Sequence, residues 1–268
     1  MASLSTVSVP IHGNYRHYHG YLYCHAGPSD SRLALLPPGL LTSARVLDIG
    51  CNEGVVTCEI AQSYGAELVV GVDIDEALVR MAWKRRRNVW SSQQPEQTDS
   101  RAITLSPRST AGYFPESCAH MFGPLPIPPQ QSPPAASHFP HNVAFRCADW
   151  VNTRIQEDDN LYDVCIAFSI TKWIHLNNGD EGIKTFFQRI YDTLVPGGAF
   201  VLEPQPWDSY AKARKLHPTL HRNAQGLMLR PENFGVLLEE MGFRRGRRLG
   251  VPGEGRFKRP IEIYMKQG

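Results

Sequence analysis

The sequence has no C-x-x-C pair among its six cysteines, no apolar run of about 18 residues, and no basic segment followed by an apolar stretch near its first residue. Structural zinc sites and redox centres usually carry paired cysteines, so neither is expected, and the cysteines are interpreted as reduced intracellular thiols. A membrane-spanning helix needs about 20 apolar residues, and a secretory signal needs a basic and an apolar region in succession. We therefore expect a soluble protein of the nucleus or cytoplasm with no membrane partner.

The sequence also lacks a strong excess of charge of one sign, with a net charge of +2 and a pI near 8.2. That balance alone does not indicate a nucleic-acid-binding protein, since such domains are often much more basic. The basic residues are nevertheless gathered in clusters, which indicates segregated charge. These clusters are 84–87, Lys212 with Arg214 and Lys215, and 244–248. The histidines, cysteines and carboxylates do not have the spacing of metal ligands, so no metal site is expected.

Residues 46–54 read VLDIGCNEG, an apolar strand that ends in an acid and is followed by spaced glycines. Such a turn holds nucleotide-type cofactors, because the glycines let the backbone approach the ligand. Asp73 ends the next apolar run, where a carboxylate accepts hydrogen bonds from ribose hydroxyls. Dinucleotide sites require G-x-G-x-x-G, whereas Asn52 replaces the second glycine here and Asp48 would repel a pyrophosphate. Asp48 suits the amino group of a methionine moiety, so S-adenosylmethionine (SAM) is favoured over NAD. An ordinary strand-to-helix turn is the alternative for the motif alone.

Strands and helices are predicted to alternate, which is typical of a parallel sheet with helices on both faces. The predicted strands are 45–49, 68–73, 142–147, 162–168, 199–203 and 261–264. The predicted helices, from apolar residues at helical spacing and from glycine and proline stops, are 54–63, 77–89, 183–194 and 234–241. The last strand is expected to pair antiparallel with residues 247–251. The pattern indicates an α/β fold of the Rossmann-like class.

Residues 91–140 contain ten of the 21 prolines, with many Ser and Gln residues and few aliphatic ones. Such a segment cannot bury enough apolar surface to offset the entropy lost on ordering. We interpret it as a largely disordered insertion in a single domain, 1–268, because each flanking block lacks the strands of a complete sheet. A ligand for partner modules is the alternative. Residues 1–44 are interpreted as a segment that covers the substrate and cofactor site.

Polar and aromatic residues follow the predicted strands, where a doubly wound sheet binds its ligands. Asp149 and Trp150 follow the third strand, where a carboxylate and a ring face could hold an adenine. The alternative is a helix cap with a packed tryptophan. Lys172, His175 and Trp207 follow the fourth and fifth strands and are expected to surround the reactive end of the cofactor.

Four tyrosines lie within residues 15–23, among them Tyr15 and Tyr18, with cations between them. Aromatic residues interleaved with cations stack bases and contact phosphates in proteins that bind RNA. Covering an apolar face of the domain is the alternative explanation for this segment.

Two stretches are more specific than the glycine turn: TKWIHLNNGDEG at 171–182 and LEPQPW at 202–207. They are accompanied by GNY at 13–15, Tyr18, Gly20-Tyr21, Arg32-Leu33, VLDIGCN at 46–52 and GVDID at 71–75. With these stretches the sequence resembles the RNA 5′-phosphate methyltransferases of the bicoid-interacting-protein-3 family, over nearly the whole folded chain. His19 and Leu22 depart from the family's pattern, which has a tyrosine and an arginine there.

The resemblance implies a class I SAM-dependent methyltransferase fold with a mostly parallel, seven-stranded sheet. The SAM-binding positions that it implies, together with Asp48 from the motif, are Arg32, Gly50, Cys51, Asn52, Asp73, Ile74, Asp149, Trp150 and Phe168. Lys172 and Tyr18 would face the RNA 5′ phosphate as the catalytic positions. The expected substrate contacts are Tyr15, Trp173, His175 and Trp207.

The implied reaction is methyl transfer from SAM to the terminal 5′ phosphate of an RNA. Lys172 favours the γ-phosphate of a 5′-triphosphate small nuclear RNA, because relatives acting on a monophosphate differ at that position. The alternatives are methylation of a 5′-monophosphate RNA such as a tRNA, a catalytically weak RNA-binding scaffold of a ribonucleoprotein, and a small-molecule methyltransferase. We expect a nuclear monomer that has ribonucleoprotein partners.

Overall fold

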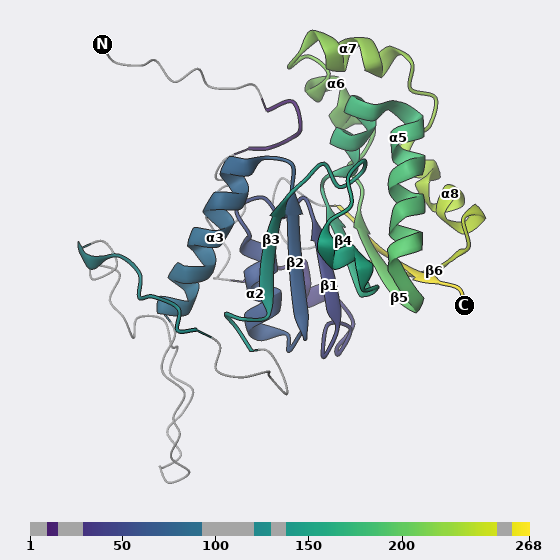
Figure 1. The fold of residues 1–268 in the computed structure, drawn as a ribbon. Helices are drawn as coiled ribbons and strands as arrows, with labels where there is room; N and C mark the ends of the chain where they lie inside the picture. Colours follow the sequence, from purple (N-terminus) through teal and green to yellow (C-terminus); the bar gives the residue numbers. More distant parts are fainter. Residues whose placement is uncertain (1–9, 16–28, 93–120, 130–137, 251–258) are drawn as a thin grey trace, which may run out of the picture.

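The structure is a computed structural model that describes residues 10–15, 29–92, 121–129, 138–250 and 259–268. Its centre is a seven-stranded sheet in the order β3-β2-β1-β4-β5-β7-β6 (Figure 1). The strands are β1 Arg45–Ile49, β2 Leu68–Asp73, β3 Val143–Cys147, β4 Tyr162–Phe168, β5 Leu194–Glu203, β6 Phe243–Leu249 and β7 Ile261–Lys266. The first five strands run parallel, and β7 runs antiparallel to both β5 and β6. The predicted fold class is therefore confirmed.

Helices lie on both faces of this sheet. The α-helices are α2 Val55–Ser63, α3 Glu76–Ser91, α5 Thr171–Thr193, α6 Asp208–Ala213, α7 Pro218–Gln225 and α8 Phe234–Glu240. Three short 3-10 helices are η1 Leu33–Leu35, η2 Gln156–Asp159 and η3 Pro231–Asn233. α6 follows the carboxyl end of β5, and Figure 1 shows α6 and α7 beyond the end of the sheet, at the top of the view.

Successive strand residues point to opposite faces, which divides the core into two layers. In β1, Val46 packs with side chains of α2 and α3, while its neighbour Leu47 packs with side chains of α5 and α8. Both residues are fully buried. Because both faces of the central strands are covered, their sequences are apolar almost throughout, as expected for parallel strands.

The helix predicted at 183–194 is longer than the apolar spacing indicated. α5 begins at Thr171, and Gly179, with φ 72° and ψ −171°, interrupts it. In the half before Gly179, Trp173 and Leu176 pack against α6 and α7 and not against the sheet. These two residues therefore do not continue the apolar spacing of the second half of the helix. β5 likewise begins earlier than predicted, because Leu194 already pairs with Tyr162 ahead of the glycines at 197–198.

The predicted pairing of the last strand is confirmed in part. β7 pairs with β6 through Arg248 and Glu262 and through Leu249 and Ile261. However, β7 also pairs with β5, so β6 and not β7 forms this edge of the sheet.

Most of the predicted insertion lies outside the described residues, at 93–120 and 130–137. Residues 121–129 are described, and Pro124 and Leu125 contact the end of α3: Arg87 Nη2 donates to Pro124 O at 3.0 Å, and Leu125 N donates to Ser91 Oγ at 2.9 Å. Among the described residues, the structure contains no helix that is both long and apolar enough to cross a membrane.

Candidate functional site

The turn after β1 is shaped by residues with left-handed backbone angles. Gly50 has φ 78°, and a Cβ there would lie 2.3 Å from Cγ2 of Ile170. Asn52 adopts φ 51°, and its side-chain oxygen accepts from the N–H of Glu53 at 2.9 Å, which stabilises the turn locally. The N–H groups of Gly50 and Cys51 both donate to the Val72 carbonyl, at 2.8 and 3.0 Å. The turn is therefore held against the end of β2.

Asp73 closes that same corner from β2. Its carboxylate accepts from the N–H of Asn52 at 2.9 Å and from the N–H of Asp75 at 2.9 Å. Burial raises the pKa of Asp73, and these two N–H donors oppose the shift. A partly satisfied, buried carboxylate at a strand end is what the ribose hydroxyls of SAM require. Ile74 follows it with 39% of its surface exposed, which leaves an apolar face beside the carboxylate.

Asp48 is buried near the end of β1, where its carboxylate faces a side chain of α2. Thr57 Oγ1 donates to its carboxylate at 2.6 Å. Burial raises its pKa to about 6, against the effects of Thr57 and of the Arg32 charge. A cationic ligand group next to Asp48 would offset the cost of its buried charge, which fits the amino group of SAM. The Cys51 side chain packs in the core, and burial raises the pKa of its thiol.

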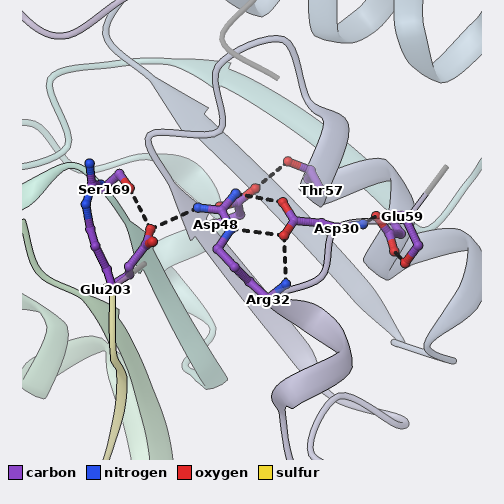
Figure 2. A network of polar contacts seen from close by, with 9 residues as sticks. Asp30, Arg32, Asp48, Thr57, Glu59, Ser169 and Glu203 are labelled. Atoms are coloured by element: carbon purple, nitrogen blue, oxygen red, sulfur yellow. Dashed lines mark hydrogen bonds and ion pairs between the residues drawn. The ribbon is translucent and has the colours of Figure 1, made fainter. Parts of the chain in front are cut away.

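Arg32 lies between two acids that come from distant parts of the chain (Figure 2). Its guanidinium donates to Asp30 at 2.7 and 3.0 Å and to Glu203 Oε2 at 3.0 Å. It also stacks 4.4 Å from the ring centroid of Phe168. All four side chains are buried. The network therefore fixes the segment before η1 against the carboxyl ends of β4 and β5, the edge where parallel sheets bind ligands.

The described part of the N-terminal segment crosses this edge. Asn14 Nδ2 donates to Asp75 at 2.6 Å, and Asn52 Nδ2 donates to the Tyr15 carbonyl at 3.0 Å. The Tyr15 ring lies edge-on to Trp173, with centroids 5.8 Å apart. The segment thereby joins the glycine turn, the start of α3 and the start of α5. Tyr18, predicted to face the phosphate, lies outside the described residues.

Lys172 lies in the first turn of α5, at the carboxyl edge of the sheet. Its Nζ is 4.9 Å from the ring centroid of Trp173. Burial, together with the nearby charges of Arg259 and Lys212, lowers the pKa of Lys172 to about 8. Three cations therefore converge on one region, which suits a ligand with several negative charges.

Two predictions about ring positions are wrong. The Trp150 ring was expected to face an adenine, but it is 3% exposed, donates to Asp158 and packs edge-on against Phe186. The structure thus supports the packed tryptophan. His175 was expected to contact the substrate, but its ring is fully buried. The ring is hydrogen-bonded to the Tyr210 hydroxyl at 3.2 Å and to Asp180 at 2.7 Å. It has a structural position between α5 and α6.

The remaining predicted residues lie around the edge. Asp149 is partly exposed at the end of β3, where it accepts from Asn152 Nδ2 at 2.8 Å. Trp207, between β5 and α6, is covered by Arg230, whose guanidinium carbon lies 3.8 Å from the ring centroid.

The sequence reasoning assigned no role to Ser169, Glu203, Gln205 or Arg259, which form the polar frame behind Lys172. Glu203 and Gln205 lie in the specific LEPQPW stretch, so the sequence did contain a signal for these two residues. Gln205 Oε1 accepts from Thr171 Oγ1 at 3.1 Å and from the N–H of Lys172 at 3.0 Å.

Comparison with known proteins identifies the chain's relatives. The family model "Bicoid-interacting protein 3 (Bin3)" matches residues 162–266, and a methyltransferase-domain model matches residues 46–123. The 7SK snRNA methylphosphate capping enzyme of Mus musculus is 38% identical over 95% of this chain, which spans 40% of that enzyme. The U6 snRNA methylphosphate capping enzyme Amus of Drosophila melanogaster is 32% identical over 95% of this chain and 74% of its own length. A probable RNA methyltransferase of Arabidopsis thaliana is 35% identical over 87% of this chain and 72% of its own.

Solved structures show the same fold at low identity. A putative SAM-dependent methyltransferase from Listeria monocytogenes has a TM-score of 0.50 and 15% identity, over 88% of this chain and 96% of that one. The N-methyltransferase NodS from Bradyrhizobium japonicum has a TM-score of 0.50 and 13% identity, over 88% and 92%. The sheet order, the glycine turn and these relatives all indicate the same kind of protein. The chain has the class I SAM-dependent methyltransferase fold and belongs to the Bicoid-interacting protein 3 (Bin3) family.

Proposed function

We propose that the protein transfers a methyl group from SAM to the 5′-terminal phosphate of an RNA, the γ-phosphate of a triphosphate end. The observation that carries this proposal is the position of Lys172, a half-buried cation near Arg259 and Lys212, at the sheet edge that also carries the glycine turn and Asp73. The glycine turn and Asp73 form a cofactor corner of this edge, and Lys172 with its neighbouring cations forms a cationic corner. Two such corners on one edge suit a reaction between a sulfonium compound and an anion.

The residues of the first corner fit SAM. Asp73 would accept hydrogen bonds from the ribose hydroxyls, and Asp48 would lie near the amino group. Ile74 and Phe168 offer apolar surface, and Asp149 a carboxylate for the adenine amine. SAM, when bound, supplies a methyl group on a positively charged sulfur. Residues 13–15 would keep water from this corner, since they bridge the glycine turn and α3.

The second corner fits a phosphate nucleophile. A terminal phosphate is anionic near neutral pH, because its second pKa is about 6, so its attack needs no general base. What it needs is in-line positioning and partial neutralisation of the neighbouring charge. Lys172 supplies one cation held by the N-terminal turn of α5. Tyr15, which is 38% exposed, offers a ring for the first nucleotide of the RNA, whereas Trp173 is buried and Trp207 is covered by Arg230.

The setting of the reaction is proposed from the relatives. Two of them are named for small nuclear RNAs, 7SK and U6, which supports a small nuclear RNA substrate and action in the nucleus. We also propose ribonucleoprotein partners for a monomeric enzyme.

The test uses labelled SAM and one RNA sequence with a triphosphate, a monophosphate or a hydroxyl at its 5′ end. We expect label to enter only the RNAs with a 5′ phosphate, and the triphosphate RNA most. Lys172→Ala should lower the rate about tenfold to a hundredfold, the cost of about 1.5–3 kcal/mol for a lost charge-assisted contact, with SAM affinity unchanged. Lys184→Ala is the matched control, because Lys184 is an exposed lysine on the same helix. Equal labelling of the hydroxyl RNA would overturn the proposal.

A further inference from the structure

Arg259 reaches the ligand-binding edge because of strand direction. β7 is antiparallel to the parallel strands, so its first residues lie at the edge where those strands end. β5 and β7 pair Ala199 with Met265 and Leu202 with Glu262. Continuing this register beyond the last pair places Arg259 opposite Gln205. The residue two positions before β7 therefore brings a guanidinium to the edge that carries Lys172.

A chain of hydrogen bonds holds that guanidinium. Arg259 Nη1 donates to Ser169 Oγ at 2.7 Å, and Ser169 Oγ donates to Glu203 Oε2 at 2.5 Å. The same carboxylate oxygen accepts from Arg32 at 3.0 Å (Figure 2). Ser169 holds its position with a left-handed φ of 59°, unusual for a residue with a side chain. Such strain persists only where surrounding contacts fix it, and it is common at functional sites.

Arg259 and Lys172 are attached to one frame through Gln205. The amide of Gln205 donates to the Ser169 carbonyl and accepts from the N–H of Lys172. Gln205 itself is buried. The Lys172 backbone and the Arg259 guanidinium are therefore held by the same frame, and the Arg259 charge helps to lower the pKa of Lys172. Two neighbouring like charges repel, and a bound polyanion would relieve that repulsion.

We propose that Arg259 is a specificity-determining residue that binds the inner phosphates of a 5′-triphosphate, those between the methylated phosphate and the first nucleoside. The inference rests on the proposed function. A guanidinium presents five N–H donors in a planar fork that matches phosphate oxygens, and it stays protonated at every relevant pH. Lys172 contacts the reacting phosphate, whereas Arg259 binds the inner phosphates, which a monophosphate end does not have.

The experiment compares the wild type with Arg259→Gln and Arg259→Lys on one RNA sequence with a 5′ triphosphate or a 5′ monophosphate. Arg259→Gln should lower kcat/KM about tenfold to a hundredfold on the triphosphate RNA and less than about threefold on the monophosphate RNA. Arg259→Lys should fall between, since it keeps the charge but not the fork. Arg247→Gln, an exposed arginine in β6, is the control for a general loss of positive charge.

Two binding measurements separate this inference from the proposed function. SAM affinity by calorimetry should stay within about twofold, and affinity for inorganic tripolyphosphate should fall about tenfold or more in Arg259→Gln. If the wild type labels neither RNA while tripolyphosphate binding still depends on Arg259, the proposed function fails and the phosphate site stands. An equal loss on both RNA ends, unchanged tripolyphosphate binding, or a large loss of SAM affinity would each overturn the role of Arg259. Arg259→Lys provides the same readouts if Arg259→Gln does not fold.

Discussion

At the scale of single residues, the Lys172 ammonium changes its charge in the mildly alkaline range of pH. Burial and two neighbouring cations lower its pKa to about 8, so the cation is present below that pH and is lost above it. The phosphate nucleophile stays anionic throughout the alkaline range. We therefore predict that kcat/KM for triphosphate RNA falls as the pH rises through about 8, with the slope of one proton.

Lys172→Arg is the matched variant for this pH dependence. A guanidinium remains protonated, so the alkaline fall should vanish even if the overall rate is lower. The readout is the pH profile of kcat/KM, which reports the free enzyme, between pH 6.5 and 9.5. A flat profile in the wild type would show that the Lys172 charge does not control the rate, and an equal fall in Lys172→Arg would show that another group titrates.

The sequence predicted the backbone position of a residue where that position is set locally. Gly50 and Asp73 could be placed because a turn and a strand end fix them within a few residues. Trp150 and His175 could not, because the direction of a ring depends on partners far along the chain, Phe186 for one and Tyr210 for the other. Arg259 was missed since the register of an antiparallel strand cannot be read from its own sequence.

At the scale of elements, residues 10–15 show how a short irregular segment can matter to a site. The segment is held by side chains from three elements, through Asn52, Asp75 and Asn177, and not by a ladder of its own. Gly13, with φ 74°, leaves no room for a side chain, because a Cβ there would lie 2.1 Å from Nε1 of Trp173. Sequence periodicity has no signal for such a segment, and only the tyrosines at 15–23 and the resemblance of GNY at 13–15 drew attention to it.

We predict that Gly13→Ala displaces this segment and weakens SAM binding about fivefold to thirtyfold, equivalent to roughly 1–2 kcal/mol. The free energy of unfolding should change little, because the segment contributes little to the core. Gly39→Ala is the control: Gly39 has φ 80° but no atom within 4 Å of the added Cβ. It should cost about 1 kcal/mol of stability and leave SAM affinity unchanged. Calorimetry showing the same SAM affinity in both variants would contradict the covering role.

At the scale of the whole molecule, the site is assembled from segments far apart in sequence. Asp30, Asp73, Lys172, Glu203 and Arg259 meet at one edge because the parallel strands all end there and β7 begins there. The alternation of strands and helices predicted this edge, since any doubly wound sheet has it. It could not predict which side chains face each other across it, because that depends on the packing of α5, η1 and the last hairpin.

Residues 93–120 connect α3 to the described residues 121–129, and this connection allows a last prediction. Leu125 and Pro124 contact the end of α3, at Ser91 and Arg87, so the chain on both sides of the replaced stretch is fixed at one place. Replacing residues 95–120 by a short Gly/Ser link should leave the melting temperature within a few degrees and methyl transfer within about twofold, because loop length changes the closure entropy only slowly. A second deletion extended through residue 129 should destabilise the protein more, since it removes the contacts with α3. If the shorter deletion abolished SAM binding, the composition of this segment would have been misread and it would have to form part of the site.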